Sequence, residues 1–392
     1  MRRWLCLLLL FVGFVGCRRT DDGSTAVSAR PIMVPPSGTA AAPSPPKGPW
    51  VGKRLHVWVT ACDGESREVA DIVGFAAKYP TVLGGVGVAC TVITRDGALE
   101  AQAEQPVGLG RASVARRIGK LGLPASLVVS NVAADGFDGA LALAALSKAA
   151  TRARLADNIV HLARHEAFAS VELDFEMMPT GAGAGYVKLA EEVGARLRAD
   201  GGRTELSIDV HPKTVDDPGW SGPGAHDYAA LAKTGAVLRL MTYDLSIGPV
   251  PAGPSTKASW VREVVAYARS KGVPPEQLEI GLPAYGYDFP PQGNGAALPM
   301  RFEEVNALRV RVNAELSRDA ADVPHFHYDA PDGRHEVWFD DGKSIARLLD
   351  ELADLAPYVR GVAVWGIGRS DPDLGKRLAE QGFQVAAGPP RW

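Results

Sequence analysis

Short apolar runs alternate with helically spaced segments over most of the chain after Lys53. Apolar runs bounded by polar turns indicate buried strands, and apolar residues that recur every three or four positions indicate amphipathic helices. Eight strands are predicted in this way: Leu55–Thr60, Val82–Ile93, Ala125–Val132, Ser170–Met177, Thr204–Val210, Val237–Thr242, Leu278–Pro283 and Gly361–Trp365. Helices are predicted between them, at Glu65–Lys78, Ala153–His165, Gly185–Ala199, Asp227–Lys233, Lys257–Lys271 and Ser344–Leu355.

This alternation predicts an α/β protein, a (β/α)8 TIM barrel over residues 54–385, because strands that alternate with helices over about 330 residues fit that fold. An open doubly wound sheet is the alternative. No G-x-G-x-x-G or P-loop motif follows a strand, so no nucleotide or other cofactor is indicated. The segment Phe289–Asp340 breaks the rhythm with Pro, Gly and short aromatic runs. We therefore expect a small α+β insertion at about 290–340, between the seventh and eighth strands, that walls one side of a cleft.

The amino-terminal residues are typical of an export signal. Two arginines precede an apolar run, Trp4–Val15, which is shorter than the roughly 20 residues of a membrane span. Residues 1–16 are therefore predicted to be a signal peptide. The segment Phe14–Cys17 resembles a bacterial lipobox with Phe in place of the usual Leu, so we expect Cys17 to be lipidated. The alternative is a plain secreted protein with an incidental cysteine.

The segment that follows Cys17 is typical of a tether. Residues 18–50 contain seven prolines and few bulky side chains, and such a composition favours extended chain over a folded core. A tether over residues 17–53 would hold the folded part away from a membrane. We therefore expect an exported, cell-envelope lipoprotein that is anchored through its lipid alone and is monomeric, with its folded part outside the cytoplasm.

The charge and the cysteine content of the chain indicate which partners and which cysteine chemistry to expect. The chain has 42 Lys and Arg against 45 Asp and Glu, a net charge of −3, so no basic field attracts nucleic acid. Of the four cysteines, Cys6 leaves with the signal and Cys17 is the predicted lipid site. Cys62 and Cys90 remain, and in an exported protein we expect them to be neighbours or a disulfide. No Cys and His spacing indicates a metal site.

Three carboxyl groups lie at alternate positions in the strand-like segment that ends near Met178. Side chains alternate between the two faces of a strand, so Glu172, Asp174 and Glu176 share one face. On a barrel strand this face points inward, with Glu176 nearest the carboxyl end. Crowded carboxyl groups raise at least one pKa, which lets a Glu act as a general acid near neutral pH. The alternative is an exposed edge strand with a solvated acidic face.

Two segments resemble motifs of family 18 glycoside hydrolases. Leu173–Glu176 resembles the end of the D-x-x-D-x-D-x-E signature, and Met241–Asp244 resembles the M-x-Y-D motif. Further segments resemble, in order, the spore-cortex-lytic, germination-type branch: Val210–Thr214, Ala225–Tyr228, Gly281–Phe289, His335–Asp340 and Gly361–Trp365. The resemblance covers about Leu55 to Leu378, nearly all of the predicted barrel.

The resemblance implies a retaining glycosidase of β-1,4-linked N-acetylglucosamine polymers or oligomers that uses the acetamido oxygen of its substrate as the nucleophile. Glu176 would protonate the leaving oxygen and later activate water. Asp174 would accept a hydrogen bond from the acetamido N–H and stabilise the oxazolinium ion, and Tyr243 would donate to the acetamido group. Five further residues would contribute to substrate binding, the Trp as an apolar floor: Glu172, Met241, Asp244, Tyr285 and Trp365.

The sequence departs from the family signature before Asp174. Ala169, Ser170 and Glu172 stand where the signature has Asp, a frequent Gly, and Asp. The middle carboxylate normally shares a proton with the next Asp, and the longer Glu172 can keep that role or shift the pH optimum. The alternatives to an enzyme are a lectin-like carbohydrate-binding protein and a tethered adhesion protein. Lectin-like relatives usually lose the terminal Glu, which is present here as Glu176. Chitin, peptidoglycan and N-glycan all stay open as substrates, as do endo and exo action.

Overall fold

The computed structural model describes residues 48–102, 110–166, 168–199, 204–217, 219–247, 250–291, 295–368 and 370–383. The predicted signal segment, Cys17 and most of the predicted tether lie outside the described residues. The folded part begins before the predicted boundary at residue 53, because Trp50 is completely buried. Its ring stacks on Phe383 at 5.8 Å, and its Nε1 donates to the carbonyl oxygen of Leu349 at 3.1 Å.

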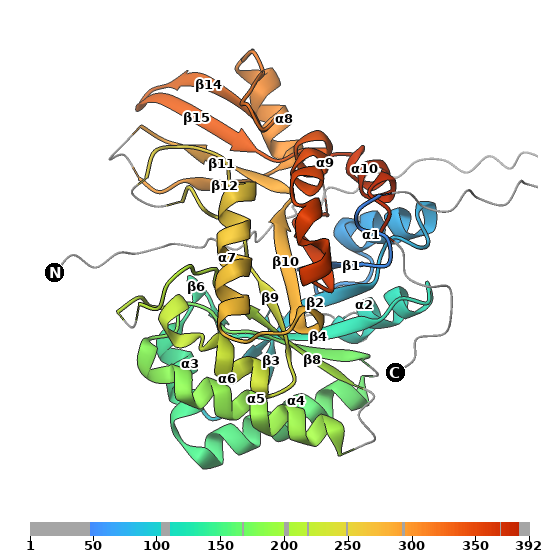
Figure 1. The fold of residues 1–392 in the computed structure, drawn as a ribbon, viewed down its shortest axis with the longest axis vertical. Helices are drawn as coiled ribbons and strands as arrows, with labels where there is room; N and C mark the ends of the chain where they lie inside the picture. Colours follow the sequence, from blue (N-terminus) through green and yellow to red (C-terminus); the bar gives the residue numbers. More distant parts are fainter. Residues whose placement is uncertain are drawn as a thin grey trace, which may run out of the picture.

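Eight parallel strands close into a barrel (Figure 1), as the sequence predicts. They are β1 (Arg54–Val59), β2 (Gly85–Ile93), β4 (Ala125–Ser130), β7 (Ser170–Asp174), β8 (Glu205–Val210), β9 (Val237–Leu240), β10 (Leu278–Pro283) and β16 (Gly361–Trp365). Each strand pairs with its neighbour, and β1 pairs with both β16 and β2, which closes the ring. The short β3 (Leu99–Ala101) adds to β2 in antiparallel direction, and β5 (Val132–Ala133) and β6 (Gly136–Phe137) form a hairpin.

Nine α-helices of the described residues surround the barrel: α1 (Arg67–Lys78), α2 (Arg111–Gly119), α3 (Gly139–Ser147), α4 (Ala149–His165), α5 (Gly183–Arg198), α6 (Tyr228–Lys233), α7 (Ala258–Ser270), α9 (Gly342–Glu351) and α10 (Leu374–Glu380). Short 3-10 turns are η1 (Thr180–Ala182), η2 (Pro223–Ala225), η3 (Pro275–Gln277) and η4 (Ala353–Tyr358). Side-chain caps begin several helices: Ser66 accepts from the Val69 N–H at the start of α1, and Asp341 accepts from the Ser344 N–H at the start of α9. The sequence pattern missed α3 because its Ala and Leu residues give it no polar face.

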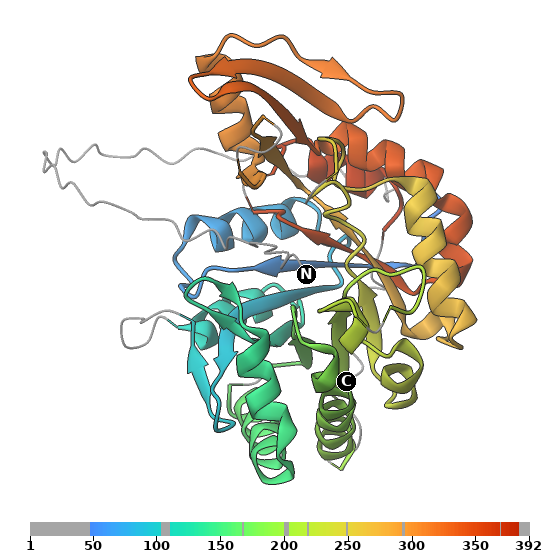
Figure 2. The same cartoon turned by 90° about the vertical axis from the view of Figure 1, so that its left-hand side faces the viewer.

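A separate antiparallel sheet is inserted between β10 and β16. It consists of β11 (Tyr285–Phe289), β12 (Leu298–Arg301), β13 (Ser317–Arg318), β14 (Pro324–Ala330) and β15 (Gly333–Phe339), with α8 (Phe302–Arg311) against it. Figures 1 and 2 both place this sheet on the opposite side of the barrel from α4 and α5. Its own small core contains Val305, Phe326 and Val337. The sheet begins at Tyr285, directly after β10, a few residues before the predicted start.

The barrel strands divide their side chains between an apolar outer face and a polar interior. On β7, Val171 and Leu173 are completely buried and belong to the main core shared with the helices, while Glu172 points inward. Farther along the axis, Trp58 crosses the interior because Gly87 leaves room for it: a Cβ there would lie 2.4 Å from the Trp58 ring. The barrel interior therefore holds polar residues together with a small apolar cluster of Trp58, Val128 and Ala363.

A disulfide joins the first two barrel strands. Cys62, just after β1, pairs with Cys90 on β2, and their Cα atoms are 5.4 Å apart. The bond closes a segment that contains α1. No helix of the described residues is both long enough and apolar enough to cross a membrane.

Candidate active site

The chain leaves the barrel at the carboxyl end of β7, directly before Glu176. Asn131, which follows β4, fixes the main chain there: its Oδ1 accepts from the Glu176 N–H at 2.8 Å, and its Nδ2 donates to the Glu176 carbonyl oxygen at 2.9 Å. Met177 then adopts a left-handed conformation, with φ of 52°, which is uncommon for a non-glycine residue. Glu176 is therefore held at the barrel mouth by contacts on either side of its backbone.

Glu176 is buried, with 6% of the residue exposed. Burial raises the pKa of Glu176 well above its ordinary value, and the charges of Asp174 and Asp244 raise it further. This is the direction expected for crowded carboxyl groups. This direction favours the protonated form of Glu176, the state that a general acid requires.

Asp174 is the last residue of β7 and lies beside Glu176. Burial and the charge of Glu172 raise the pKa of Asp174 to about 7, and a hydrogen bond with Glu176 partly opposes this effect. Its Oδ1 is buried and has no hydrogen-bond partner among the described residues. Since a buried acceptor without a partner is costly, this oxygen is suited to accept an N–H from a bound ligand.

Two stacked histidines, His211 and His226, support the loop around Glu176, with ring centroids 5.4 Å apart. His226 Nδ1 accepts from the His211 N–H at 3.0 Å, so its Nε2 carries the proton and donates to the Phe175 carbonyl oxygen at 3.0 Å. His211 Nε2 lies 3.5 Å from Glu176 Oε2 and 3.4 Å from the Met177 nitrogen. Burial lowers the pKa of both histidines, that of His211 to about 4, so both rings are neutral at pH 7.

The sequence analysis assigned no role to Asn131, His211 or His226. Asn131 had a detectable signal, because it is a polar residue directly after the apolar run of β4, at the end where barrel sites form. The two histidines fall inside segments that carry the family resemblance. Their contacts with Phe175 and Met177 depend on how β7 and β8 lie side by side, which no local pattern shows.

The predicted M-x-Y-D residues lie at the carboxyl end of β9. Asp244 has φ of 64°, and its Oδ1 accepts from the hydroxyl groups of Tyr285 at 2.6 Å and Tyr287 at 2.7 Å. Burial raises the pKa of Asp244, while these hydrogen bonds oppose the rise. Asp244 also raises the pKa of Glu176, so the ends of β7 and β9 belong to one electrostatic site.

Aromatic rings form the wall of this site. Tyr243 meets Tyr285 edge to face at 6.2 Å, and both pack in one cluster with Trp365 at the end of β16. Trp365 also meets Trp58 edge to face at 5.4 Å. Gly281 makes room for this arrangement, because a Cβ there would lie 2.9 Å from the Tyr243 ring. Trp365 stays partly exposed, as a surface on which a sugar could stack.

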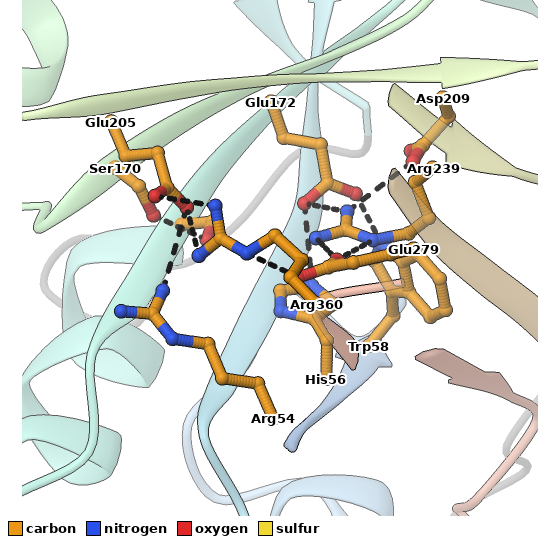
Figure 3. Close-up of polar contacts among 11 residues, drawn as sticks. Arg54, His56, Trp58, Ser170, Glu172, Glu205, Asp209, Arg239, Glu279 and Arg360 are labelled. Atoms are coloured by element: carbon orange, nitrogen blue, oxygen red, sulfur yellow. Dashed lines mark hydrogen bonds and ion pairs between the residues drawn. The ribbon is translucent and has the colours of Figure 1, made fainter. Parts of the chain in front are cut away.

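Most of the predicted site residues are thus brought together at the mouth: Asp174, Glu176, Met241, Tyr243, Asp244, Tyr285 and Trp365. Glu172 requires a correction. It was predicted to contribute to substrate binding, but it is completely buried below the mouth. Arg239 binds it at 2.7 Å, His56 lies 3.3 Å away, and Trp58 Nε1 donates to it (Figure 3). It can therefore affect a ligand only through Asp174.

The arrangement combines a carboxyl group of raised pKa, an acceptor carboxyl group, a tyrosine hydroxyl and a partly exposed indole. Burial raises the pKa of Tyr243 well above its ordinary value, so its hydroxyl stays a donor. Such groups can protonate a leaving oxygen and stabilise a developing positive charge. Among the residues that the structure describes, no cluster of His, Cys, Asp and Glu is arranged to hold a metal ion.

Comparison with known proteins identifies relatives of this chain. The chain is 28% identical over 260 residues to the cortical fragment-lytic enzyme of Bacillus subtilis strain 168, a match that covers 65% of this chain and 59% of that protein. It is 29% identical over 259 residues to the protein of the same name from Bacillus cereus, with 65% and 59% covered. The matched part is thus less than two thirds of the length of these relatives.

Solved structures share the fold. The crystal structure of the Bacillus cereus spore cortex-lytic enzyme SleL superimposes with a TM-score of 0.72 and 26% identity over 86% of this chain and 76% of that chain. A chitinase from Chromobacterium violaceum has the same fold, with a TM-score of 0.71 and 24% identity over 84% and 98% of the two chains. The model of the family described as glycosyl hydrolases family 18 matches residues 136–370, which include both carboxyl groups at the mouth. The chain therefore belongs to glycosyl hydrolase family 18.

Proposed function

We propose that the chain hydrolyses glycans that contain β-1,4-linked N-acetylglucosamine, and that it does so by a substrate-assisted retaining mechanism. The observation that carries this proposal is the Asp174 and Glu176 pair at the mouth of a family 18 barrel. One carboxyl group of the pair is protonated near neutral pH and the other offers a buried, unpartnered oxygen. A lectin-like binding protein on the same barrel is the alternative, and it would not need a proton donor at this position.

Glu176 acts first as the general acid. Its raised pKa keeps a proton available at neutral pH, and this proton passes to the glycosidic oxygen as the bond to the sugar carbon breaks. Asn131 aims the group through the Glu176 backbone. In the second half of the reaction, the Glu176 carboxylate accepts a proton from the attacking water and so returns to its starting state.

Asp174 and Tyr243 hold the acetamido group of the substrate. The free Oδ1 of Asp174 accepts the acetamido N–H, which directs the acetamido oxygen toward the sugar carbon and stabilises the positive charge on the cyclic intermediate. The Tyr243 hydroxyl donates to the same group. Trp365 supports the apolar face of the sugar, and Asp244, fixed by Tyr285 and Tyr287, shapes the subsite.

Peptidoglycan, or fragments of it, is the substrate we favour within this class. The curated relatives are cortical fragment-lytic enzymes, and a spore cortex-lytic enzyme superimposes at 26% identity. Chitin-type oligomers are the second choice, since chitinases share the fold. The sequence motifs of the germination-type branch support the first choice.

The test is hydrolysis of N-acetylglucosamine oligomers, purified peptidoglycan and a free N-glycan by the purified chain, with products identified by mass. We expect products from the wild type, none from Glu176→Gln, and none from oligomers that lack the N-acetyl groups. Proton NMR of the first products should show the β-anomer, as retention requires. Binding without products from either form would replace this proposal with the lectin-like function.

We also propose that the chain is an exported lipoprotein with Cys17 as its lipidated residue. The support is the apolar segment Trp4–Val15 followed by Gly16 and Cys17, together with a Cys62–Cys90 disulfide, which suits an oxidising compartment. Expression in a bacterium with labelled palmitate should label the chain, and Cys17→Ser should not be labelled. Equal labelling of both forms would exclude this site.

A further inference from the structure

Arg239 lies at the centre of the barrel interior, between carboxyl groups of three different strands (Figure 3). Its Nη1 is 2.7 Å from Glu172 Oε2 and 3.2 Å from Asp209 Oδ1, and its Nη2 is 2.9 Å from Glu279 Oε2. The Trp58 ring lies 5.1 Å from the guanidinium carbon. All five side chains are at least nine-tenths buried. The guanidinium is therefore fixed on every side directly below the catalytic pair.

Glu172 has no freedom to turn toward Asp174. One carboxylate oxygen accepts from Trp58 Nε1, and the other is paired with Arg239 and lies 3.3 Å from His56 Nε2. Burial alone would raise the pKa of Glu172, but the charge of Arg239 outweighs it and holds this pKa below the ordinary value. This lowered pKa favours the anionic form of Glu172.

The pKa of Asp209 is shifted in the opposite direction. Burial and the charge of Glu172 raise the pKa of Asp209 well above its ordinary value, and Asp209 shares a hydrogen bond with Glu172. Glu279 has a second cation, because Arg360 Nε lies 3.3 Å from its Oε1. His56 is neutral at pH 7, since burial lowers its pKa. The titratable and charged groups around Glu172 come from five strands and the end of one of them. They are His56 (β1), Asp174 (β7), Glu176 (after β7), Asp209 (β8), Arg239 (β9) and Glu279 (β10).

We propose that Arg239 is a positioning residue that holds Glu172 as a permanent anion beneath Asp174, so that Asp174 exchanges its proton with Glu176 and not with Glu172. The inference rests on the proposed glycosidase function and assigns a new role to a residue outside the family motifs quoted above. In this arrangement Glu172 affects catalysis through its charge alone. A side chain in that place that shared a proton would need an oxygen turned toward Asp174. One Glu172 oxygen accepts from Trp58 Nε1, and the other has no hydrogen-bond partner among the described residues but lies 2.7 Å from Arg239 Nη1 as an ion pair.

The two possible roles of Glu172 predict different pH profiles for Glu172→Gln. Glutamine lacks the charge but resembles a protonated glutamate in shape. If Glu172 is a fixed anion, its removal eases ionisation of Asp174, and the acidic limb of kcat/KM moves to lower pH by on the order of one pH unit. If Glu172 normally carries a shared proton, glutamine replaces that state and the limb stays in place. Glu279→Gln is the matched control, because Glu279 is another carboxylate bound to Arg239 but does not face Asp174. The acidic limb of kcat/KM for the Glu279→Gln variant should not move.

Arg239 variants test the cation itself. In Arg239→Gln, Glu172 loses its partner and takes up a proton, so adding Glu172→Gln to Arg239→Gln should move the acidic limb much less than Glu172→Gln moves it in the wild type. Arg239→Lys keeps the charge and should restore a limb close to that of the wild type. If Arg239→Gln does not fold, Glu172→Gln beside Glu279→Gln still decides the question.

Chemical unfolding as a function of pH gives a readout that needs no substrate. The difference between the wild type and Asp174→Asn reports the proton bound by Asp174. We expect the stability difference that Asp174→Asn makes to stop changing at a lower pH in the Glu172→Gln background than in the background with Glu172. An unchanged difference, an unmoved limb in Glu172→Gln, or an equally large movement when Glu172→Gln is added to a folded Arg239→Gln overturns the proposal. Absence of hydrolysis by the wild type overturns the proposed function alone, because the unfolding comparison still tests Arg239.

Discussion

Asn131 binds the main chain of Glu176 through two hydrogen bonds of opposite direction, one to the N–H at 2.8 Å and one to the carbonyl oxygen at 2.9 Å. Asn131 is completely buried, and its Nδ2 also donates to the Asp138 carbonyl oxygen at 3.0 Å. The asparagine therefore joins β4 to the segment that carries the proposed acid. Its amide cannot be replaced by an apolar group without leaving buried backbone groups unpaired.

We expect Asn131→Ala to lower the free energy of unfolding by roughly 2–4 kcal/mol, because two buried backbone groups lose their partner. We also expect kcat to fall by about 10-fold or more, since the Glu176 carboxyl group loses its fixed direction. Urea unfolding and hydrolysis assays measure the two effects. Asn131→Asp is the matched control: it keeps the acceptor for the Glu176 N–H but loses both donors. An Asn131→Ala form with wild-type kcat would show that the backbone contacts do not orient Glu176.

The second prediction separates the carboxyl groups of β7 and its carboxyl end by role. We expect Glu176→Gln to abolish hydrolysis, because glutamine has no acidic proton to give to the leaving oxygen. We expect Glu172→Gln only to weaken hydrolysis, because Glu172 is completely buried and acts through its charge. Single-turnover assays on the same glycan compare the two. Circular dichroism checks that both variants fold, and equal losses at the two positions would contradict this ranking.

The strands of the barrel and the position of Glu176 could be predicted from the sequence because both depend on local patterns. Buried parallel strands are continuous apolar runs, and side-chain alternation alone places Glu172, Asp174 and Glu176 on one face. The interior ion cluster could not be assembled in this way. It joins side chains from β1, β7, β8, β9 and β10, and their spacing depends on the closure of the barrel. A partial signal existed, because Arg239 and Glu279 are single charges within apolar strands.

The role of Glu172 shows the limit of reasoning from a motif. Its position in the signature indicated a proton partner for Asp174, and no local feature indicated that Arg239, 67 residues later in the sequence, would bind it. The start of the folded part was missed for a related reason. Trp50 lies among prolines and glycines, and its burial depends on Phe383 near the other end of the chain.

The third prediction concerns the Cys62–Cys90 disulfide, which closes a segment with a sequence separation of 28. Cross-linking this segment restricts the unfolded chain, and for a loop of this length the expected contribution is about 3–4 kcal/mol. We therefore expect the Cys62→Ser, Cys90→Ser double variant to unfold at a lower urea concentration than the oxidised wild type. Reduction of the wild type with dithiothreitol should lower its stability to a similar value and leave the double variant unchanged. A wild type that does not respond to reduction would show that the bond is absent or contributes little.

The last prediction concerns the stability cost of the active-site carboxyl pair. Burial and the charge of Glu172 raise the pKa of Asp174 from 3.8 to about 7. Between about pH 4 and pH 7, Asp174 therefore holds a proton in the folded chain but not in the unfolded chain. The free energy of unfolding falls as the pH rises through this window. Asp174→Asn has no such titration. We expect it to be more stable than the wild type at pH 8 by about 2–4 kcal/mol, and expect the difference to shrink toward pH 4.

Urea unfolding of the two proteins from pH 4 to pH 8 measures this difference. Asp340, far from Asp174 in the sequence, is the matched control, because burial raises its pKa to about 7 as well while Ser344 donates to it at 2.8 Å. Asp340 titrates in both the wild type and Asp174→Asn, so its contribution cancels in the stability difference between them. Asp340→Asn should keep hydrolysis and remove a separate part of the pH dependence of stability. Parallel curves for the wild type and Asp174→Asn would show that Asp174 is ionised to the same extent in the folded and unfolded chains. Stability curves that converge toward pH 4 instead identify Asp174 as a group whose ionisation destabilises the fold. In the proposed mechanism the same ionisation prepares the site for an acetamido N–H, and such a loss of stability in favour of activity is expected at a catalytic centre.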